Sequence, residues 1–480
     1  MRSEDTPGFL RPLGRLTLSV FLLSMAGCAT FDFRPIDATT SAESWNRRAL
    51  GDEGLHTFLA QASPRPPVTW PQLDWNLDQL TLAALYFQPS LDVARAQLEV
   101  ARSAAITAGQ RPNPTLNASA TYDTTTRPPW IPAISFDLPV ETAGKRGHRS
   151  EAAERNAEAA RWGWVDQIWQ VRAGVRSNLL AVYRARRSAA LLERQVSARA
   201  EVVRLLEGQL QAGAIAPTDV SLARIALRTD QLGWQQAQQA EGEALAGLAE
   251  AIGLPDSSLA DVKLSFAGLE QLPPAVPARD TQLEAVLHRA DVRGGLATYA
   301  ASQADLQLEI ANQYPDIHLG PGYEFDQTDN KWTLGLTLPL PLLNRNEGPI
   351  AEARARRRLA AAQFVAIQAK ALNEVALAIL ACRSTREQWQ TATVLLEDQR
   401  QRRESVRAQQ RAGDADPLAT ATADVEYDTE AAIELATFVK AQESLGRLEA
   451  VTQSSSTIPP QELRATEDKM PVNEGDSHER

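Results

Sequence analysis

Long amphipathic stretches dominate the pattern of apolar positions along the chain. Between residues 146 and 211, apolar residues recur at intervals of seven, and most positions between them are Arg, Gln, Glu or Ala. These apolar positions are Ile168, Val175, Val182, Ala189, Val196, Val203 and Leu210. A stripe this narrow is typical of packing between helices. At about 1.5 Å per residue, the helix would extend about 100 Å. A plain coiled-coil rod is the simplest structure that fits this periodicity.

The chain also repeats itself with a period of about 200 residues, which indicates a tandem duplication. The stretch QAGAIAPTDV at 211–220 returns as RAGDADPLAT at 411–420, and SFDLPV at 135–140 is answered by GLTLPL at 335–340. Each copy predicts one helix, two short alternating runs, a very long helix, a Gly/Pro corner and a returning helix. The predicted helices are 90–112, 146–211 and 217–252 in the first copy and 280–312, 347–411 and 417–450 in the second.

The short alternating runs exclude a plain rod. In AISFDL, Ile134, Phe136 and Leu138 alternate with Ser135 and Asp137, which predicts a strand with one apolar face. The run TLNASATYD and two runs in the second copy alternate in the same way, with apolar positions Leu116, Ala118, Ala120, Tyr122, Ile317, Leu319, Tyr323, Phe325, Trp332, Leu334, Leu336 and Leu338. About ten residues is the length of a tilted transmembrane strand.

Four strands cannot close a barrel, and an unpaired strand edge costs several kcal/mol in lipid. If these strands lie in a membrane, the chain must therefore oligomerise. Three copies would supply twelve strands around a lumen lined by Thr, Asn, Ser and Asp side chains. A small soluble antiparallel sheet packed on the helices is the alternative.

The amino terminus resembles an export signal. Arg11 and Arg15 precede the apolar run LTLSVFLLSMAG, which is too short to span a bilayer. The run ends in Met-Ala-Gly-Cys, which resembles a lipobox and predicts that Cys28 is acylated after removal of residues 1–27. An ordinary signal peptide, with Cys28 incidental, is the alternative. Only Cys382 remains as a second cysteine, so the composition indicates no disulfide framework.

These features predict six segments. They are a lipoprotein signal peptide at 1–27, an extended segment at 28–75, a first repeat at 76–253, a linker at 254–277, a second repeat at 278–452 and a disordered tail at 453–480. The formal charge of −11 argues against a nucleic-acid partner. The low aromatic content of 6% within 44% hydrophobic residues also favours long Ala- and Leu-rich helices over compact cores.

The order of these parts, present twice behind a lipobox, resembles the TolC family of trimeric outer-membrane efflux channels over nearly all of residues 76–452. The segments LPVETAGKRGHRSEAA and LPLPLLNRNEGPIAEARA resemble the strand-to-helix junctions of the heavy-metal branch, whose members work with cobalt, zinc and cadmium pumps. The resemblance implies a mainly α fold. Long antiparallel helices would form a periplasmic α-barrel, and four strands per chain would enter a twelve-stranded trimeric β-barrel.

The resemblance also implies partners and sites. The partners are two further copies of the chain, a periplasmic adaptor protein, an inner-membrane pump and outer-membrane lipid. The two corners would be the periplasmic tips where the adaptor docks, with the residues Gly213, Pro217, Thr218, Asp219, Gly413 and Pro417. Glycine can end a helix in the left-handed conformation, and proline suits the first turn of the next helix. Asp219 is either a gate residue or only a partner of the helix dipole.

The second corner departs from the family pattern, because Ala419 and Thr422 stand where members place acidic residues. Asp414 and Asp416 are therefore the candidate gate residues, since three copies would gather six carboxylates at the narrowest point. The alternative is that they are solvated turn residues.

No catalytic constellation, metal-ligand spacing or phosphate-binding loop is present in the sequence, and the five histidines are scattered. The prediction is a channel without catalytic residues, metal site or cofactor, located in the bacterial outer membrane. It would passively conduct heavy-metal cations exported by the inner-membrane pump. The alternatives are the same channel serving drugs or other small organic compounds, and a periplasmic coiled-coil lipoprotein that forms no pore.

Overall fold

The computed structural model describes residues 31–62, 70–72, 74–273 and 286–454. The predicted signal peptide, the lipid-attachment candidate Cys28 and nearly all of the predicted tail lie outside the described residues. Contacts divide the chain into two units, one ending at Arg47 and one beginning at Arg48. The first unit contains helix α2 (Ala38–Asn46), and its amino terminus is capped by the Asp37 side chain, which accepts hydrogen bonds from two backbone amides.

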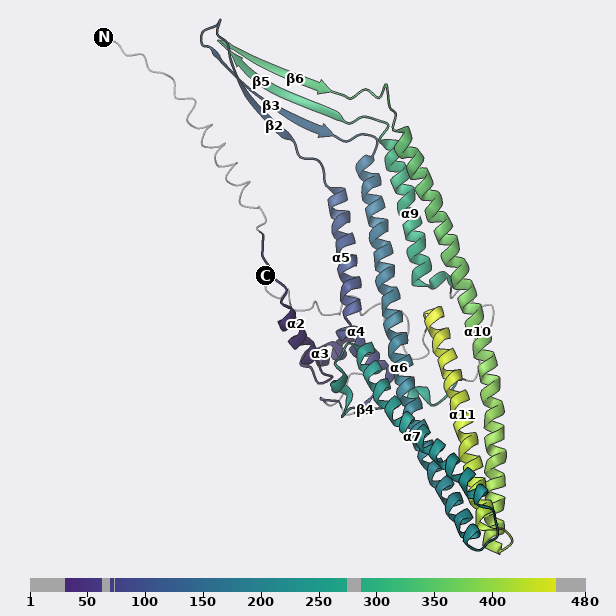
Figure 1. The fold of residues 1–480 in the computed structure, drawn as a ribbon. Coiled ribbons are helices and arrows are strands. Elements are labelled where there is room, and N and C mark those ends of the chain that lie inside the picture. Colours follow the sequence, from purple (N-terminus) through teal and green to yellow (C-terminus); the bar gives the residue numbers. More distant parts are fainter. Residues whose placement is uncertain (1–30, 63–69, 73, 274–285, 455–480) are drawn as a thin grey trace. The chain divides into compact units, whose positions relative to one another are not determined.

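The second unit contains the remaining helices and strands (Figure 1). The described helices are α3 (Glu53–Ala62), α4 (Leu77–Phe87), α5 (Pro89–Gly109), α6 (Lys145–Gln211), α7 (Pro217–Ile252), α9 (Ala290–Ala311), α10 (Glu347–Ala412) and α11 (Pro417–Thr452), with 3-10 turns η1 (Asp256–Leu259) and η2 (Ala267–Leu269). The strands are β1 (Asp74–Trp75), β2 (Thr115–Tyr122), β3 (Trp130–Val140), β4 (Lys263–Leu264), β5 (Ile317–Asp326) and β6 (Asp329–Thr337). The fold is thus mainly helical with a small sheet, as predicted.

The long helices form an open side-by-side array (Figure 1). Near the sheet the order is α5, α6, α9, α10, and towards the corners it is α7, α6, α11, α10. Among the described elements, no extensive contact joins α5 or α7 to α10. The array therefore has two free edges.

The heptad stripe of α6 lies in this array as predicted. Its members Ile168, Val175, Val182 and Val203 are buried, and the other three are half-buried. Because α6 contacts α5, α7, α9 and α11, residues outside the stripe, such as Leu179 and Tyr183, are buried as well.

The four long strands form one antiparallel sheet in the order β2, β3, β5, β6. Two hairpins build it, and β3 pairs with β5 across the repeats, with Val140 opposite Ile317. Strands β2 and β6 form the edges, and their residues are exposed along their whole length. The sheet, like the helical array, is open in the single chain.

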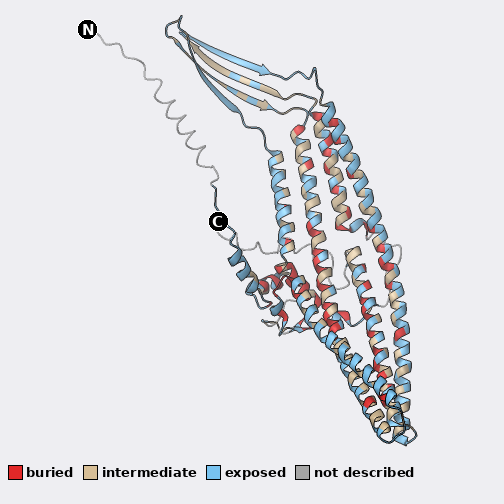
Figure 2. Ribbon diagram, in the orientation of Figure 1, coloured by how far each residue is buried: buried red, intermediate tan, exposed pale blue. Residues whose placement is uncertain are grey.

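The main core lies where α4, α6 and α7 meet, and Figure 2 shows the buried residues gathered there. The interpretation of 28–75 as extended is wrong for α2 and α3. Helix α3 places Leu55, Phe58 and Leu59 in this core, because their spacing gives it one apolar face. The predicted linker also contributes to structure, since β4 pairs in parallel with β1 and Leu264 is buried.

Candidate functional site

The two faces of the four-stranded sheet differ in chemistry. One face carries exposed apolar side chains, namely Leu116, Tyr122, Trp130, Ile134, Phe136, Leu138, Val140, Leu319, Trp332, Leu334 and Leu336. The register aligns them in rows, with Ile134 opposite Tyr323 and Tyr323 opposite Trp332. The opposite face carries polar residues such as Thr115, paired with Asp137. The alternation predicted from sequence is confirmed, and it suits lipid on one face and water on the other.

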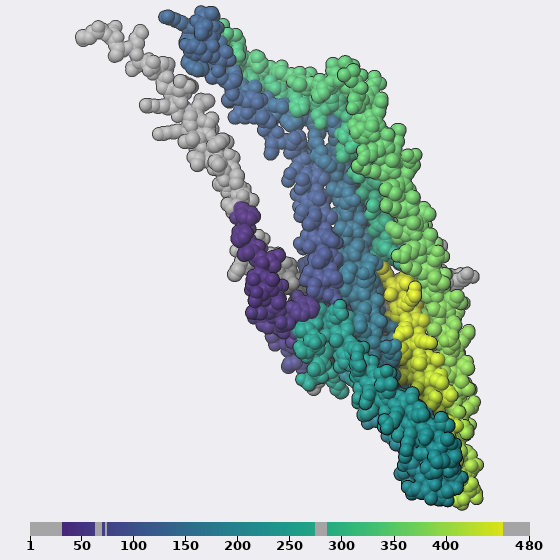
Figure 3. All heavy atoms as spheres, viewed as in Figure 1, coloured from purple at the N-terminus to yellow at the C-terminus, as the bar shows by residue number. Residues whose placement is uncertain are grey.

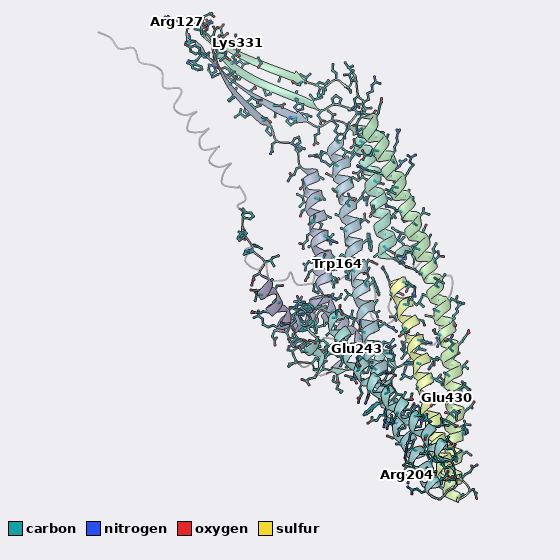
Figure 4. All side chains as sticks on the ribbon, in the orientation of Figure 1. Arg127, Trp164, Arg204, Glu243, Lys331 and Glu430 are labelled. Carbon is teal, nitrogen blue, oxygen red and sulfur yellow. The ribbon has the colours of Figure 1, made fainter. Side chains whose placement is uncertain are left out.

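Aromatic side chains gather near the hairpin turns of the sheet. The ring centroids of Tyr122 and Trp130 lie 4.9 Å apart, and those of Tyr323 and Trp332 also lie 4.9 Å apart. Figure 4 labels Lys331 at the same end, where its Nζ lies 2.6 Å from an Asp326 carboxylate oxygen. Aromatic residues close to charged strand ends are typical of the interfacial girdle of membrane barrels.

On the polar face, His318 has a partner that the sequence did not reveal. Its Nδ1 lies 2.9 Å from a carboxylate oxygen of Asp137 on the neighbouring strand β3. The sequence showed only that the histidines are scattered along the chain. The two residues are far apart in the sequence, so only the register of β3 with β5 brings them together.

The strand-to-helix junction of the first repeat is held by ion pairs. Lys145 Nζ lies 2.8 Å from an Asp316 carboxylate oxygen, and Arg149 Nη1 lies 2.8 Å from Glu141 Oε1. The Arg149 Nε also donates to the carbonyl oxygen of Ala108. These basic residues therefore connect the junction to the loop before β5 and to the end of α5.

The two Gly/Pro corners have the same backbone geometry. Gly213 and Gly413 have φ of 73° and 86°. The next residue donates its N–H to the carbonyl oxygen of Gln209 in the first corner and of Gln409 in the second, both over 2.9 Å. This is the pattern of a glycine-terminated helix. Pro217 then starts α7, just as the second corner's proline starts α11.

The corners place their acidic residues differently. In the first corner, Asp219 in the first turn of α7 accepts from the Ala216 N–H over 3.3 Å, and Thr218 is exposed beside it. In the second corner, Asp416 precedes Pro417 and accepts from the Leu418 N–H over 3.2 Å. Both carboxylates thus satisfy amides at a helix start, so the helix-terminating role predicted for the corners is present in the geometry.

The two candidate gate residues are both exposed, but their contacts differ. The Asp416 Oδ2 accepts from the Gln209 side-chain amide over 3.4 Å, which links the two corners of one chain. For Asp414, the structure shows the backbone N–H bond of the helix end. The geometry therefore leaves the Asp414 carboxylate at the surface of the corner.

Above the corners, charged residues line a groove of about 480 Å³ between α6, α10 and α11. Its lining residues are Arg199, Val202, Gln399, Arg402, Thr422, Val425, Glu426, Thr429 and Glu430. Arg402 pairs with Glu426 across this groove. Figure 3 shows that the α7 and α11 ends form one continuous tip, and Figure 4 places Glu430 above Arg204 on it.

A buried carboxylate lies next to this groove. Burial raises the pKa of Asp428, while the charges of Arg194 and Arg403 oppose that shift. Its Oδ1 lies 3.7 Å from the Arg194 Nε on α6. The Arg403 guanidinium stacks over the ring of Tyr427, at 3.7 Å from the centroid. This cluster joins all three helices just above the corners.

Sequence reasoning missed a buried arginine cluster in the middle of the array. Arg176 donates to the backbone and side-chain oxygens of Gln442 over 2.8 and 2.9 Å, and Gln442 in turn donates to the carbonyl of Leu269. Arg172 Nη1 lies 3.2 Å from Glu449 Oε2. The partners are separated by more than half the chain, and arginines on a long helix normally indicate only a solvated face.

Among the described residues, no group of three or more His, Cys, Asp or Glu side chains is placed to hold a metal ion. The second cysteine, Cys382, is buried and free. Of the predicted site residues, the corner set is brought together at one end of the array. The apolar sheet face lies at the opposite end (Figure 1).

Comparisons with known proteins show which families and structures this chain is similar to. Residues 82–254 match the family profile described as "Outer membrane efflux protein". A relative from Cupriavidus metallidurans, the cobalt-zinc-cadmium resistance protein CzcC, is 24% identical over 54% of this chain, and the match spans 61% of that relative's length. Less than two thirds of the relative is therefore covered.

Solved structures resemble the chain over a greater length. A membrane protein from Pseudomonas aeruginosa has a TM-score of 0.66 at 19% identity, covering 78% of this chain and 92% of that one. The CmeC outer membrane channel from Campylobacter jejuni has a TM-score of 0.65 at 13% identity, covering 92% and 98%. Residues 82–254 are thus similar in sequence to the outer membrane efflux proteins, and most of the chain shares the fold of these solved structures.

Proposed function

We propose that the chain is one subunit of a homotrimeric outer-membrane channel in a tripartite efflux system. An inner-membrane pump and a periplasmic adaptor would deliver the cargo, and the channel would conduct it passively. The main observation behind this proposal is that the sheet and the helical array both have free edges. The four-stranded sheet has an apolar face and two unpaired edges, and the helical array next to it also has two free edges.

The unpaired strand edges require partners if the apolar face lies in lipid. Backbone N–H and C=O groups without partners cost several kcal/mol each in the hydrocarbon region. Pairing β6 of one copy with β2 of the next satisfies both edges at once. Three copies then give twelve strands, an even number within the range of bacterial barrels.

The helices at both edges of the array support the same closure. Helix α5 exposes Val93, Val100 and Ile106, and α7 exposes Leu222, Ile225 and Leu232. On the other edge, α10 exposes the residues Leu359, Val365, Leu372, Leu377, Leu380, Val394 and Leu395. Part of α10 is long and apolar enough to cross a membrane by length and composition, yet it lies within a 66-residue helix. Packing against a neighbouring copy would cover these side chains in a closed helical barrel.

The cargo we propose is heavy-metal cations of the cobalt, zinc and cadmium type. The named function of the relative from Cupriavidus metallidurans supports this cargo. The exposed carboxylates Asp414 and Asp416 support it independently, because three copies would place six carboxylates at the tip. Drugs or small organic compounds are the alternative cargo of the same channel.

The remaining sites follow from this arrangement. The corner residues Gly213, Pro217, Thr218, Asp219, Gly413 and Pro417 would form the periplasmic tip where the adaptor docks. Cys28 would carry the lipid anchor in the outer membrane, and a mass measurement on the mature amino terminus tests that assignment. Nothing in the proposed mechanism requires a catalytic residue or a cofactor.

Growth of a deletion strain tests the cargo. The strain, with and without the restored chain, is grown across graded cobalt, zinc, cadmium, nickel and copper and across a panel of dyes and antibiotics. We expect sensitivity to metals alone, reversed by the restored chain. Sensitivity to the organic compounds alone would keep the channel and overturn the metal cargo. Full resistance without the chain to every compound would argue against an efflux role.

A planar-bilayer recording tests the tip carboxylates. We expect the double variant Asp414→Asn, Asp416→Asn to lose cation preference, measured as a reversal potential in a salt gradient. The control is Asp261→Asn, which removes an exposed carboxylate outside both corners. An unchanged reversal potential in the double variant would leave these residues as solvated turn residues.

A further inference from the structure

The segment after β6 carries an unusual run of exposed leucines. Residues 338–343 read Leu-Pro-Leu-Pro-Leu-Leu, and we refer to them as the leucine segment. The side chains of Leu338, Leu340 and Leu342 are 42%, 68% and 77% exposed, and Leu343 is fully exposed. Four exposed leucines in six residues form an apolar patch that the described part of this chain leaves uncovered.

The leucine segment is held at both ends. At one end, the last residue of β6, Thr337, pairs with His318 of β5. At the other end, the Asn346 side-chain amide donates to the backbone and carboxylate oxygens of Glu309 on α9, over 2.7 and 2.8 Å. Within the segment, the Leu342 N–H donates to the Leu340 carbonyl oxygen over 2.8 Å. The leucines are therefore presented from a fixed backbone.

The equivalent junction of the first repeat is polar. After β3 ends, Thr142 donates its N–H to an Asp316 carboxylate oxygen and its hydroxyl to the Pro315 carbonyl oxygen, over 3.0 and 2.8 Å. Both junctions lead into a long helix through a residue with left-handed backbone, Gly144 in the first and Asn346 in the second. A connection of this kind needs no leucines, so their presence in the second junction requires another reason.

The position of the segment indicates that reason. Along β6 the exposed apolar residues Trp332, Leu334 and Leu336 alternate, and the leucines at 338, 340 and 342 continue the same alternation beyond the strand. The prolines at 339 and 341 have no N–H to donate, so the segment is poorly suited to pair with a strand of another copy. Arg345 follows two residues after Leu343 and is exposed. Long basic side chains at the edge of an apolar surface can extend to the head groups of a bilayer.

We propose that the leucine segment lies in the bilayer and binds the acyl chains of the periplasmic leaflet, with Arg345 at the level of the phospholipid head groups. This rests on the proposed membrane position of the sheet. The segment extends the lipid-facing surface of β6 past the last paired residue towards the start of α10. In a trimer, three such segments would form a collar that fixes the depth of the channel in the membrane.

Collision accessibility of a nitroxide spin label tests the proposal. The label is placed at Leu343→Cys or Leu340→Cys in the Cys382→Ser chain, reconstituted in vesicles of phosphatidylethanolamine and phosphatidylglycerol. The unmodified Cys382→Ser chain gives the background signal. A label at Leu334→Cys on β6 is the lipid reference, and a label at Ala214→Cys in the first corner is the water reference. Relaxation by oxygen reports lipid, and relaxation by a water-soluble nickel chelate reports water.

We expect the labels at 340 and 343 to favour oxygen over the nickel chelate severalfold, as at 334. A label at 343 that behaves like the one at 214 would place the segment in water and overturn the proposal. An immobilised label shielded from both reagents would show that another copy of the chain covers the segment, which also overturns it. If the label at 334 were itself in water, the proposed function would fail first and the inference with it.

Discussion

In the middle of the array, each repeat has a helix that ends beside the start of another helix. The residues that stabilise these two junctions differ. Where α7 ends against the start of α5, Arg48 donates to the carbonyl oxygens of Phe87 and Gly253 over 2.7 and 3.2 Å. Where α11 ends against the start of α9, Arg289 donates to the Val451 carbonyl oxygen over 3.0 Å. In both junctions an arginine satisfies carbonyl groups at a helix carboxyl terminus.

The residue that follows the helix also differs between the two junctions. Gly253 has φ of 89°, and a Cβ there would lie 2.6 Å from the Phe87 carbonyl oxygen. Gln453 has φ of 48° and uses its side chain, accepting from the Ala290 N–H and donating to Asp166 over 2.7 and 2.8 Å. Both residues thus have a left-handed backbone, but only the second junction has space for a side chain. The first junction depends on tight packing and the second on a polar network.

The largest expected effect is at the tightly packed junction. Gly253→Ala should lower the free energy of unfolding by about 3–5 kcal/mol, because the left-handed conformation and the contact with the Phe87 backbone both oppose a Cβ. The matched variant Gly413→Ala, with open space around its Cβ position, should cost only about 1–2 kcal/mol. Thermal unfolding followed by circular dichroism measures both. Equal losses would show that packing at Gly253 is unimportant.

A smaller loss is expected from the polar junction. Arg289 also lies 2.7 and 2.9 Å from carboxylate oxygens of Asp291 and Glu374. Arg289→Ala removes this cation from Asp291 and leaves Glu374 with only the exposed Lys370, and it should cost about 2–3 kcal/mol. The control Lys370→Ala removes an exposed pair with the same Glu374 and should cost less than about 0.5 kcal/mol. Denaturant titration of the purified protein distinguishes the two, and comparable losses would contradict the buried network.

The losses of stability expected at the two corners are smaller still. Asp416→Ala removes a helix cap and should cost about 1 kcal/mol. Asp219→Ala, in the first turn of α7, should cost about 0.5 kcal/mol. Hydrogen exchange of the first-turn amides measures each helix start separately. A larger increase in exchange at the start of α7 in Asp219→Ala than at the start of α11 in Asp416→Ala would show that Asp219 is the stronger cap.

The smallest effect is a pH dependence at a position where the two repeats carry different residues. Eleven residues after the corner proline, α11 carries the buried Asp428, whereas α7 carries Arg228. Because burial raises the pKa of Asp428 in the folded state, protonation favours folding. Its stabilising contribution is complete below the ordinary aspartate pKa of 3.8 and is lost as pH rises through the folded-state value.

The variant Asp428→Asn removes that dependence. Relative to this variant, the wild-type chain should gain stability as pH falls from neutral towards the ordinary aspartate pKa. Unfolding midpoints of both proteins across that range give the measurement. Parallel curves would show that Asp428 has an unshifted pKa.

Much of the fold could be predicted from the sequence because it depends on local patterns. The heptad stripe and the corner proline set α6 and α7, and the structure ends α6 at Gln211 as predicted. The strands followed from alternation alone. The helices α2, α3 and α4 were missed. The three buried residues of α3 give too short a pattern to recognise, and α4 is buried on most sides, so its apolar residues show no clear period.

The contacts that hold the array together could not be predicted. Arg176 and Gln442 are separated by 266 positions, and Arg48 and Gly253 by 205. Such pairs depend on which helices lie side by side, which periodicity does not specify. The corner residues were found because glycine and proline mark backbone geometry directly. Their adaptor-docking and gating roles stay predictions.

In the proposed channel, two further copies of the chain close both the open sheet and the open helical array. The most direct test is the protein mass of the detergent-solubilised particle, measured by light scattering after size-exclusion chromatography with the detergent contribution subtracted. We expect the mass of three chains. A particle with the mass of one or two chains would contradict it, because the edges of β2 and β6 would then have no partner that closes a barrel.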